Sequence, residues 1–482
     1  MPDLRPVGYV IGLLVTILGA TMVVPMAVDL IEGQGHWTAF LEASLITMTT
    51  GVAMSLACAN GVKEGLTIQQ TFLLTTGVWV ALPIFGALPM ILGATDAEFV
   101  DAFFEAMSGL TTTGSTVLVG LDDLPKGLLL WRGILQWLGG IGIIVVAMVF
   151  LPELRVGGMQ IFRAEAFDTM GKILPRATEI SARISSIYVG LTVLCALSYG
   201  AAGVGTFDAI VHAMTTVATG GLSTYDNSFA ELPPAAEYVA VVFMLLAAMP
   251  FVRYVQFLSG TARPLFLDAQ VRGFFIVLVI IVLLLTLWMM PEANGNYADT
   301  FRAVLFNTTS LMTGTGFSSE NYMEWGSFPV MVLFFTGLIG GCAGSTACSI
   351  KIFRYQLLFA SIRSQIQQLR SPHGLFTPRF QGRPVAHDVL SSVMSFFVFF
   401  IVTMGAVAWM LSFTGLDFIT SVSGAATALA NVGPGLGDEI GPAGNFGGLN
   451  DSAKWILCGA MLIGRLELMV VYTILTVRFW RV

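Results

Sequence analysis

The chain has 482 residues, of which 55% are hydrophobic and only 11% are charged. A soluble protein carries about 25% charged residues, so this composition excludes an ordinary soluble domain and indicates a helical integral membrane protein. The net charge of −7 says little by itself, and we expect no nucleic-acid partner.

Apolar stretches long enough to cross a bilayer recur along the whole chain. The first is longer than the apolar core of a signal peptide, about 7–15 residues, so we expect it to be retained as a helix. The weak alternation of an outer-membrane barrel is not found. We predict ten spanning helices, at roughly 7–29, 37–59, 69–93, 131–151, 184–204, 236–258, 273–291, 329–353, 391–413 and 453–477.

The basic residues predict the orientation of these spans, because cytoplasmic segments carry an excess of Lys and Arg. With the N-terminus in the cytoplasm, only four of the 23 basic residues fall on the outer side, namely Lys126, Arg132, Arg302 and Lys454. Both termini are then cytoplasmic. The basic stretches 155–183 and 351–388 then face the cytoplasm. They are explained either by contact with phospholipids or by docking of a cytoplasmic subunit.

Four short stretches that carry glycine stand between apolar spans, each after a segment too short and too polar to cross. Asp101 precedes Gly114 by thirteen residues, and Asp208 precedes Gly221 by the same distance. Such matched offsets indicate an internal repeat. We therefore predict an all-α polytopic membrane protein with four membrane helix–pore loop–membrane helix repeats around one pseudo-fourfold pore. The repeats occupy 61–180, 181–268, 269–385 and 386–482, after an N-terminal two-helix hairpin at 1–60.

Each stretch alone is more often a loop turn, but four of them favour a ring of backbone carbonyls that replaces the water shell of a cation. A helix that ends at such a ring aims its negative dipole end at the cation. The predicted filter residues are Thr112, Thr113, Gly114, Thr219, Gly220, Gly221, Gly314, Thr315, Gly316, Asn431, Val432 and Gly433.

Two further anomalies lie at membrane depth. Glycine destabilises a helix interior, so the run 340–349 should interrupt the eighth span, although close helix packing through Gly340 and Gly344 is the alternative. Arg465 lies deep in an apolar segment. Either its positive charge lies in the pore and helps to regulate passage, or it belongs to a structural ion pair. Glu467 lies on another helix face and is a poor partner for it. The predicted gate residues are Gly340, Gly341, Gly344, Ser345, Thr346 and Arg465.

No enzyme motif is found, neither a phosphate-binding Gly-rich loop with Lys nor a His-Glu-x-x-His pair, so we expect no enzyme and no cofactor. A secondary transporter (symporter) of another cation or small solute, built on broken midplane helices, is the alternative function. Such folds have inverted or two-part repeats, which four units of the same sense disfavour.

Together with the glycine-rich run 340–346, the four stretches resemble the Trk/Ktr superfamily of potassium-uptake proteins, TrkH type. The resemblance extends over the residues around each stretch, namely 108–116, 218–224, 313–318 and 431–437. The resemblance covers nearly the whole chain, including the N-terminal hairpin. It implies potassium as the main ion, because glycine fills all four selectivity positions. Relatives that admit sodium readily often have Ser at the first of these four positions.

The resemblance also implies that the run 340–349 is an intramembrane gating loop and that Arg465 faces it. It implies a homodimer in the bacterial inner membrane, regulated by a cytosolic nucleotide-binding ring similar to TrkA. Nucleotide would bind that partner rather than this chain. One departure is that Cys348 and Ser349 stand where the family usually continues with glycines, which predicts altered gating.

Overall fold

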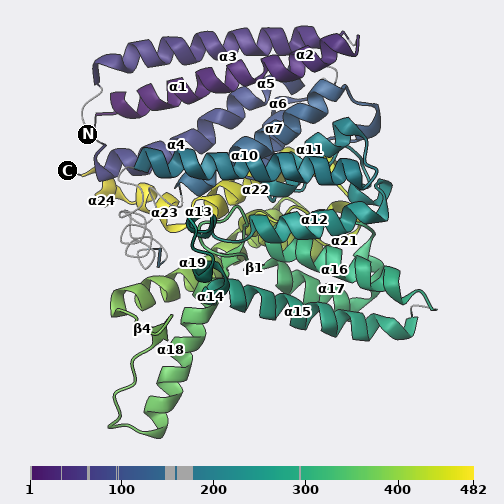
Figure 1. The fold of residues 1–482 in the computed structure, drawn as a ribbon. Coiled ribbons are helices and arrows are strands. Elements are labelled where there is room, and N and C mark those ends of the chain that lie inside the picture. The colour runs from purple at the N-terminus through teal and green to yellow at the C-terminus, as the bar shows by residue number, and fades with distance from the viewer. Residues whose placement is uncertain are drawn as a thin grey trace.

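The fold is described from a computed structural model, which covers residues 3–33, 35–61, 66–93, 95, 97–146, 158–159, 177–292 and 295–481. Within these ranges, seven helices are long and apolar enough to cross a membrane, and two further helix pairs qualify if each bent pair counts as one span. The helices lie roughly along one common direction, with the hairpin at one edge (Figure 1). Most of the predicted basic stretch 155–183 lies outside the described residues.

The N-terminal hairpin is built by close approach of two helices through small residues. A Cβ atom on Gly12 would lie 2.7 Å from the backbone nitrogen of Ser55, and one on Gly51 would lie 2.6 Å from that of Thr16. Small residues at such crossings let membrane helices pack backbone to backbone. The hairpin consists of α1 (Arg5–Thr21), α2 (Val23–Ile31) and α3 (Trp37–Cys58).

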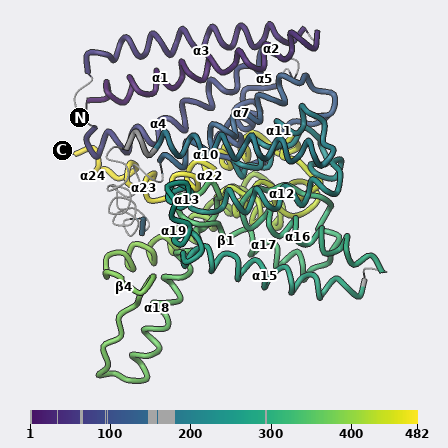
Figure 2. Tube along the Cα trace, in the orientation of Figure 1, coloured from purple at the N-terminus to yellow at the C-terminus, as the bar shows by residue number. Residues whose placement is uncertain are grey.

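The first predicted repeat begins at a capping box, in which Thr67 and Gln70 satisfy each other's backbone N–H groups. Both ends of the chain meet this helix start, because Gln70 donates to the carbonyl of Asp3 and Gln69 to that of Phe479. The first and last described residues therefore lie on the same side (Figure 2). The elements are α4 (Ile68–Gly86), α5 (Leu88–Ile91), α6 (Phe99–Leu110) and α7 (Lys126–Val145).

The second predicted repeat has a broken last helix. Its two parts are bent by 88° at Pro250, which cannot donate a helical hydrogen bond. The elements are α10 (Ala177–Ala201), α11 (Thr206–Val217), α12 (Pro234–Ala247), α13 (Phe251–Leu258) and the short α14 (Arg263–Leu267).

The third predicted repeat departs most from regular helix. Its inner helix stops at Gly337, and two short parallel strands bracket the loop that follows, with Ile339 paired to Ile350. Beyond the loop, α18 and a small antiparallel hairpin project away from the helical body (Figure 1). The elements are α15 (Ala269–Met289), α16 (Tyr297–Thr313), α17 (Ser327–Gly337), β1 (Ile339–Gly340), β2 (Ile350–Lys351), α18 (Ile352–Arg370), β3 (Arg379–Phe380) and β4 (Arg383–Pro384).

The fourth predicted repeat also has a broken last helix. The chain turns by 112° after Arg465, at Glu467 and Leu468, which both have positive φ angles of 61° and 48°. The elements are α19 (His387–Phe413), α20 (Phe418–Ala430), α21 (Gly437–Ile440), α22 (Asp451–Arg465), α23 (Met469–Leu475) and α24 (Val477–Trp480).

Nine of the ten predicted spans correspond to these helices or bent pairs, whereas 329–353 is interrupted by the run 340–349, as its glycines predict. Only its residues 329–337, nine of the eleven residues of α17, are helical before the loop, because glycine and short polar side chains exchange helical hydrogen bonds for contacts with neighbouring elements. The fourth span starts at Lys126 rather than 131. Arg132, which was assigned to the outer side, is therefore a buried helix residue, and Arg354, in the stretch predicted to face the cytoplasm, is buried as well.

Burial is distributed as expected for a protein in hydrocarbon. The outer faces of α15 and α19 expose large apolar side chains, such as Leu283 and Val402, which are 53% and 61% exposed. The central helices α6, α11, α16 and α20 instead bury Ser, Thr and Asn. Polar groups at membrane depth are tolerated where they face other protein or a watery path, so the centre of the fold is where a site belongs.

Candidate ion-conduction site

The four glycine stretches follow the C-terminal ends of four central helices with one shared backbone pattern. In each, the second residue before the filter glycine has a positive φ angle, and so has the glycine itself. These pairs are Thr112 (51°) and Gly114 (88°), Thr219 (50°) and Gly221 (78°), Gly314 (72°) and Gly316 (83°), and Asn431 (52°) and Gly433 (107°).

The hydrogen bonds that end these helices repeat as well. The residue just before each filter glycine donates its N–H to the carbonyl five positions earlier, a bond typical of a helix that ends in a left-handed residue. The four bonds are Thr113 to Ser108 (2.9 Å), Gly220 to Thr215 (2.9 Å), Thr315 to Ser310 (2.8 Å) and Val432 to Thr427 (3.1 Å). A β-branched residue such as Thr112 or Thr219 is strained in this conformation, and strain of this kind gathers at functional sites.

The four stretches meet one another in cyclic order. A Cβ atom on Gly114 would overlap the carbonyl oxygen of Gly220, and one on Gly221 would overlap that of Thr315. In the same way, Gly316 lies against the carbonyl of Val432. The circle closes at Gly433, where a Cβ atom would lie 2.9 Å from the carbonyl oxygen of Thr113. Each glycine thus makes room for the carbonyl of the next stretch, and four equivalent oxygens come together.

The outer side of this ring opens into one polar cavity of about 250 Å³. All four filter glycines line it, together with loop residues that include Ser223 and Asp226. Acidic groups gather near its mouth, where burial and then the charge of Asp226 raise the pKa of the Asp122 carboxyl above its ordinary value. Negative charge beside a narrow polar path concentrates cations there.

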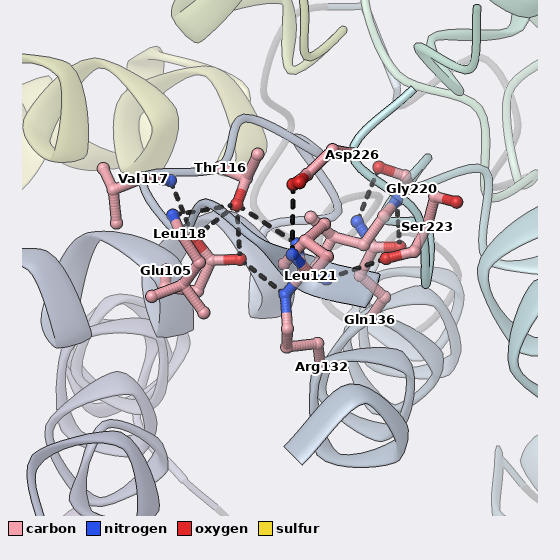
Figure 3. A network of polar contacts seen from close by, with 11 residues as sticks. Glu105, Thr116, Val117, Leu118, Leu121, Arg132, Gln136, Gly220, Ser223 and Asp226 are labelled. Atoms are coloured by element: carbon pink, nitrogen blue, oxygen red, sulfur yellow. Dashed lines mark hydrogen bonds and ion pairs between the residues drawn. The ribbon is translucent and has the colours of Figure 1, made fainter. Parts of the chain in front are cut away.

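A buried network behind the ring joins the first two stretches (Figure 3). The Arg132 guanidinium donates to Glu105 at 2.8 Å, to the carbonyl of Ser223 at 2.7 Å and to the Thr116 hydroxyl at 3.1 Å. Glu105 also accepts the backbone N–H of Val117 at 2.9 Å. Arg132 and Glu105 are 1% and 0% exposed, so their pairing is shielded from water. Burial keeps this charge-assisted network strong.

A second side chain of α7 holds the second stretch from behind. Gln136 donates its amide to the carbonyl of Gly220 at 2.5 Å and accepts the backbone N–H of Leu222 at 3.1 Å. Its side chain fills the space in which a Cβ atom of Gly220 would lie. No sequence motif links Glu105, Arg132 and Gln136, so the sequence did not predict them as parts of the site. The one available signal was a charged pair of opposite sign inside apolar segments.

The run 340–349 lies beneath the ring as a folded loop, rather than as closely packed helix. Thr346 donates its hydroxyl to the carbonyl of Ala247 at 3.1 Å, and Phe251 donates its backbone N–H to the carbonyl of Gly344 at 2.9 Å. These bonds dock the loop on the bend between α12 and α13. Gly344 has a φ angle of 74°, and Gly340 and Gly341 pack where a Cβ atom would meet neighbouring residues. The Ser345 hydroxyl closes the loop internally, onto the carbonyl of Cys342 at 2.6 Å.

Arg465 reaches this loop from the end of α22. It is 5% exposed, and its guanidinium donates to the Cys348 sulfur at 2.9 Å and to the carbonyl of Gly139 at 3.4 Å. Its Nε atom has no hydrogen-bond partner among the described residues. Glu467 lies in the turn after α22, rather than on another face of the same helix as predicted, and it pairs with Arg354 instead. The structure therefore brings Arg465 to the predicted gate loop without a carboxylate partner among the residues it describes.

Comparison with known proteins decides the family. The TrkH family, described as cation transport proteins, matches residues 36–479. The chain belongs to the TrkH family. It is 42% identical to the Trk system potassium uptake protein TrkI of Halomonas elongata, over 99% of this chain and 97% of that protein. It is 36% identical to TrkH of Escherichia coli, over 99% of both chains.

A solved structure agrees with the TrkH fold over the full length. The crystal structure of the potassium transporter TrkH from Vibrio parahaemolyticus superposes with a TM-score of 0.91 at 34% identity and covers 100% of both chains. The prediction of an all-α polytopic membrane protein and the family resemblance are thereby confirmed, whereas the layout of ten spans in four repeats stays a prediction. The alternative of a symporter for another cation or a small solute finds no support, because these relatives are named potassium uptake proteins or a potassium transporter.

Proposed function

We propose that this protein carries potassium into the cell across the bacterial inner membrane, through the ring formed by its four glycine stretches. The observation that carries the proposal is the cyclic contact of Gly114, Gly221, Gly316 and Gly433 with the carbonyls of their neighbours. Such a ring can replace the hydration shell of an alkali cation. The names of the relatives supply the ion, which is potassium.

In this proposal the filter consists of the twelve residues predicted from the sequence, three in each stretch. The negative ends of α6, α11, α16 and α20 point toward it and favour a cation. Glycine is required at the ring because a Cβ atom would displace a carbonyl of the neighbouring stretch. Potassium is the substrate, and the chain binds no cofactor of its own. The repeat boundaries at 60/61, 180/181, 268/269 and 385/386 remain part of the proposal.

The loop 340–349 and Arg465 form the proposed gate. The loop lies in the path directly beneath the ring, and the positive charge of Arg465 lies at the same depth and repels a cation there. Opening then requires the loop to leave its bonds to the bend at α12 and α13.

The cytoplasmic side of the proposal includes a partner. Four arginines are exposed on the projecting segment formed by α18 and the β3–β4 hairpin, namely Arg363, Arg370, Arg379 and Arg383. This segment stands away from the helical body (Figure 1), as suits a docking face for a cytosolic nucleotide-binding subunit similar to TrkA. A homodimer and cytoplasmic termini complete the proposal. Cross-linking of single cysteines on α18 to the partner would test the docking face.

Uptake of potassium and rubidium into bacteria that lack their own uptake systems tests the function. The wild-type chain should restore growth at low potassium and should take up rubidium in the presence of excess sodium. Gly114→Ser should weaken rubidium-over-sodium discrimination by about tenfold, the ratio that about 1.4 kcal/mol of lost differential binding produces. Wild-type discrimination in this variant would count against the filter, and no uptake by a well-expressed wild-type chain would count against the function.

A further inference from the structure

The last residues of the gate loop close the lower ends of two central helices. Cys348 donates its backbone N–H to the carbonyl of Thr313 at 3.3 Å, and Ser349 donates its own to the carbonyl of Ala430 at 2.8 Å. Thr313 and Ala430 are the last helical residues of α16 and α20. These carbonyls have no partner inside their helices, so the loop satisfies groups that otherwise face the path.

The Cys348 side chain reaches a third stretch. Its sulfur lies 3.4 Å from the hydroxyl of Thr112 and 3.9 Å from the carbonyl of the same residue. Thr112 is the strained residue at which the first filter stretch turns, with a φ angle of 51°. A side chain that packs against this turn helps to fix the carbonyl of the next residue, Thr113, which belongs to the ring.

The same sulfur accepts from the guanidinium of Arg465 at 2.9 Å. One buried atom thus touches a filter stretch, the gate loop and the buried arginine. Cys348 also packs closely against the third filter stretch, because a Cβ atom on Gly314 would lie 2.8 Å from the Cβ atom of Cys348. Replacement of this thiol therefore changes the support of the first and third stretches together, rather than the loop alone.

We infer that Cys348 is a positioning residue for the ion filter, whose thiol ties the first filter turn to the gate loop and to Arg465. The inference rests on the proposed function and deepens it. It makes the gate loop a part of the selectivity mechanism, because the ring keeps its shape only while the loop supports it. A loop that merely blocks the path would change the amount of flux without changing which ion passes.

The test compares Cys348→Ala with a matched control, Cys342→Ala, in the full-length protein reconstituted in liposomes. Cys342 is a buried cysteine of the same loop, and within the described residues its thiol makes no hydrogen bond. Initial uptake of rubidium and of sodium is measured separately, and the ratio of the two is compared. The ratio separates a role in the filter from a general loss of folded protein, which lowers both rates equally.

We expect Cys348→Ala to raise the sodium-to-rubidium ratio by about fivefold, as befits the loss of the contacts of one polar side chain. Cys342→Ala should keep the wild-type ratio. Cys348→Ser, which keeps a shorter polar side chain, should restore part of the discrimination and also serves if the alanine variant does not fold. An unchanged ratio in Cys348→Ser and Cys348→Ala, or an equal rise in Cys342→Ala, overturns the inference.

A second measurement asks whether the thiol and Thr112 act together. If they do, Thr112→Val, which removes the hydroxyl, and Cys348→Ala should shift the ratio by less in combination than the product of their separate effects. Independent, multiplicative effects would contradict the coupling. Rubidium uptake by the wild-type protein is measured first in the same assay. If the wild-type protein takes up no rubidium, the proposed function itself fails, independently of any variant.

Discussion

Two buried arginines, one on each side of the filter ring, have very different surroundings. Arg132, on the outer side, has a carboxylate, a hydroxyl and a carbonyl as acceptors at 3.1 Å or less. Arg465, on the inner side, has a thiol at 2.9 Å and a more distant carbonyl, and its Nε atom lacks a partner among the described residues.

This difference separates a fixed part of the molecule from a part that can move. A buried charge that is hydrogen-bonded to several acceptors is held firmly, whereas a buried charge with few acceptors loses little interaction energy when it is displaced. The outer network therefore holds the ring in shape, and the inner contact suits a gate. Four predictions examine this contrast, from the largest expected effect on stability to the smallest.

Loss of the Glu105 carboxylate should be the most damaging change. Glu105→Ala leaves Arg132 buried without its counter-charge, which costs about 3–5 kcal/mol of folding stability. Thermal unfolding of the purified protein in detergent measures this loss. The chain should also lose rubidium uptake, because two filter stretches lose their support. A variant that unfolds at the wild-type temperature would show that the network is not structural.

Gln136→Leu should have an intermediate effect. It removes two hydrogen bonds to the second stretch and leaves the N–H of Leu222 without its acceptor, which costs about 1–3 kcal/mol. Rubidium uptake should need a higher external concentration for half-maximal rate. Gln367→Leu on α18 is the control, since Gln367 is exposed, and it should match the wild type in both measurements.

Replacement of Arg465 should change flux more than stability. Arg465→Met should unfold within about 1 kcal/mol of the wild type, because removal of a poorly satisfied buried charge offsets the lost contacts. Arg465→Ala should raise rubidium flux in liposomes without any cytosolic partner. Arg363→Ala, at an exposed arginine of α18, is the control. A collapse of flux together with misfolding would favour the structural ion-pair explanation of Arg465.

The smallest effect is expected for an exposed ion pair at the hairpin. Lys126 and Glu32 lie 2.9 Å apart, and their side chains are 42% and 40% exposed. Glu32→Gln should lower stability by no more than about 0.2–1 kcal/mol, since solvent and salt screen such pairs. The same unfolding assay applies. An effect as large as that of Glu105→Ala would remove the distinction between buried and exposed charges on which the comparison rests.

Much of the fold was predictable because it depends on local patterns. The apolar stretches predicted ten spans, of which nine correspond to helices or bent pairs, and the matched offsets around Gly114 and Gly221 predicted equivalent places in the fold. The glycines marked the positive φ angles that the filter stretches need. Each of these features is visible within a few residues of sequence.

The remaining features depend on contacts between distant segments. Arg132 was assigned to the outer end of a span, because nothing near it in sequence indicates Glu105 on the preceding helix or the Ser223 carbonyl as its partners. The glycines of the run 340–349 predicted an interruption of the span 329–353. They did not predict that the loop bonds with α12 and α20, because those partners lie far away in sequence. The sequence marked Cys348 only as a departure in the gate loop, and its contacts were not predictable, since both partners, Thr112 and Arg465, lie more than 100 residues away.

The most direct test of the central claim is the position of rubidium in the protein. Rubidium scatters X-rays anomalously, so crystals grown in its presence reveal where the ion binds. The account predicts anomalous density on the axis of the ring, within coordination distance of the carbonyl oxygens of Thr113, Gly220, Thr315 and Val432. Rubidium bound only elsewhere in the protein, with an empty ring, would contradict it.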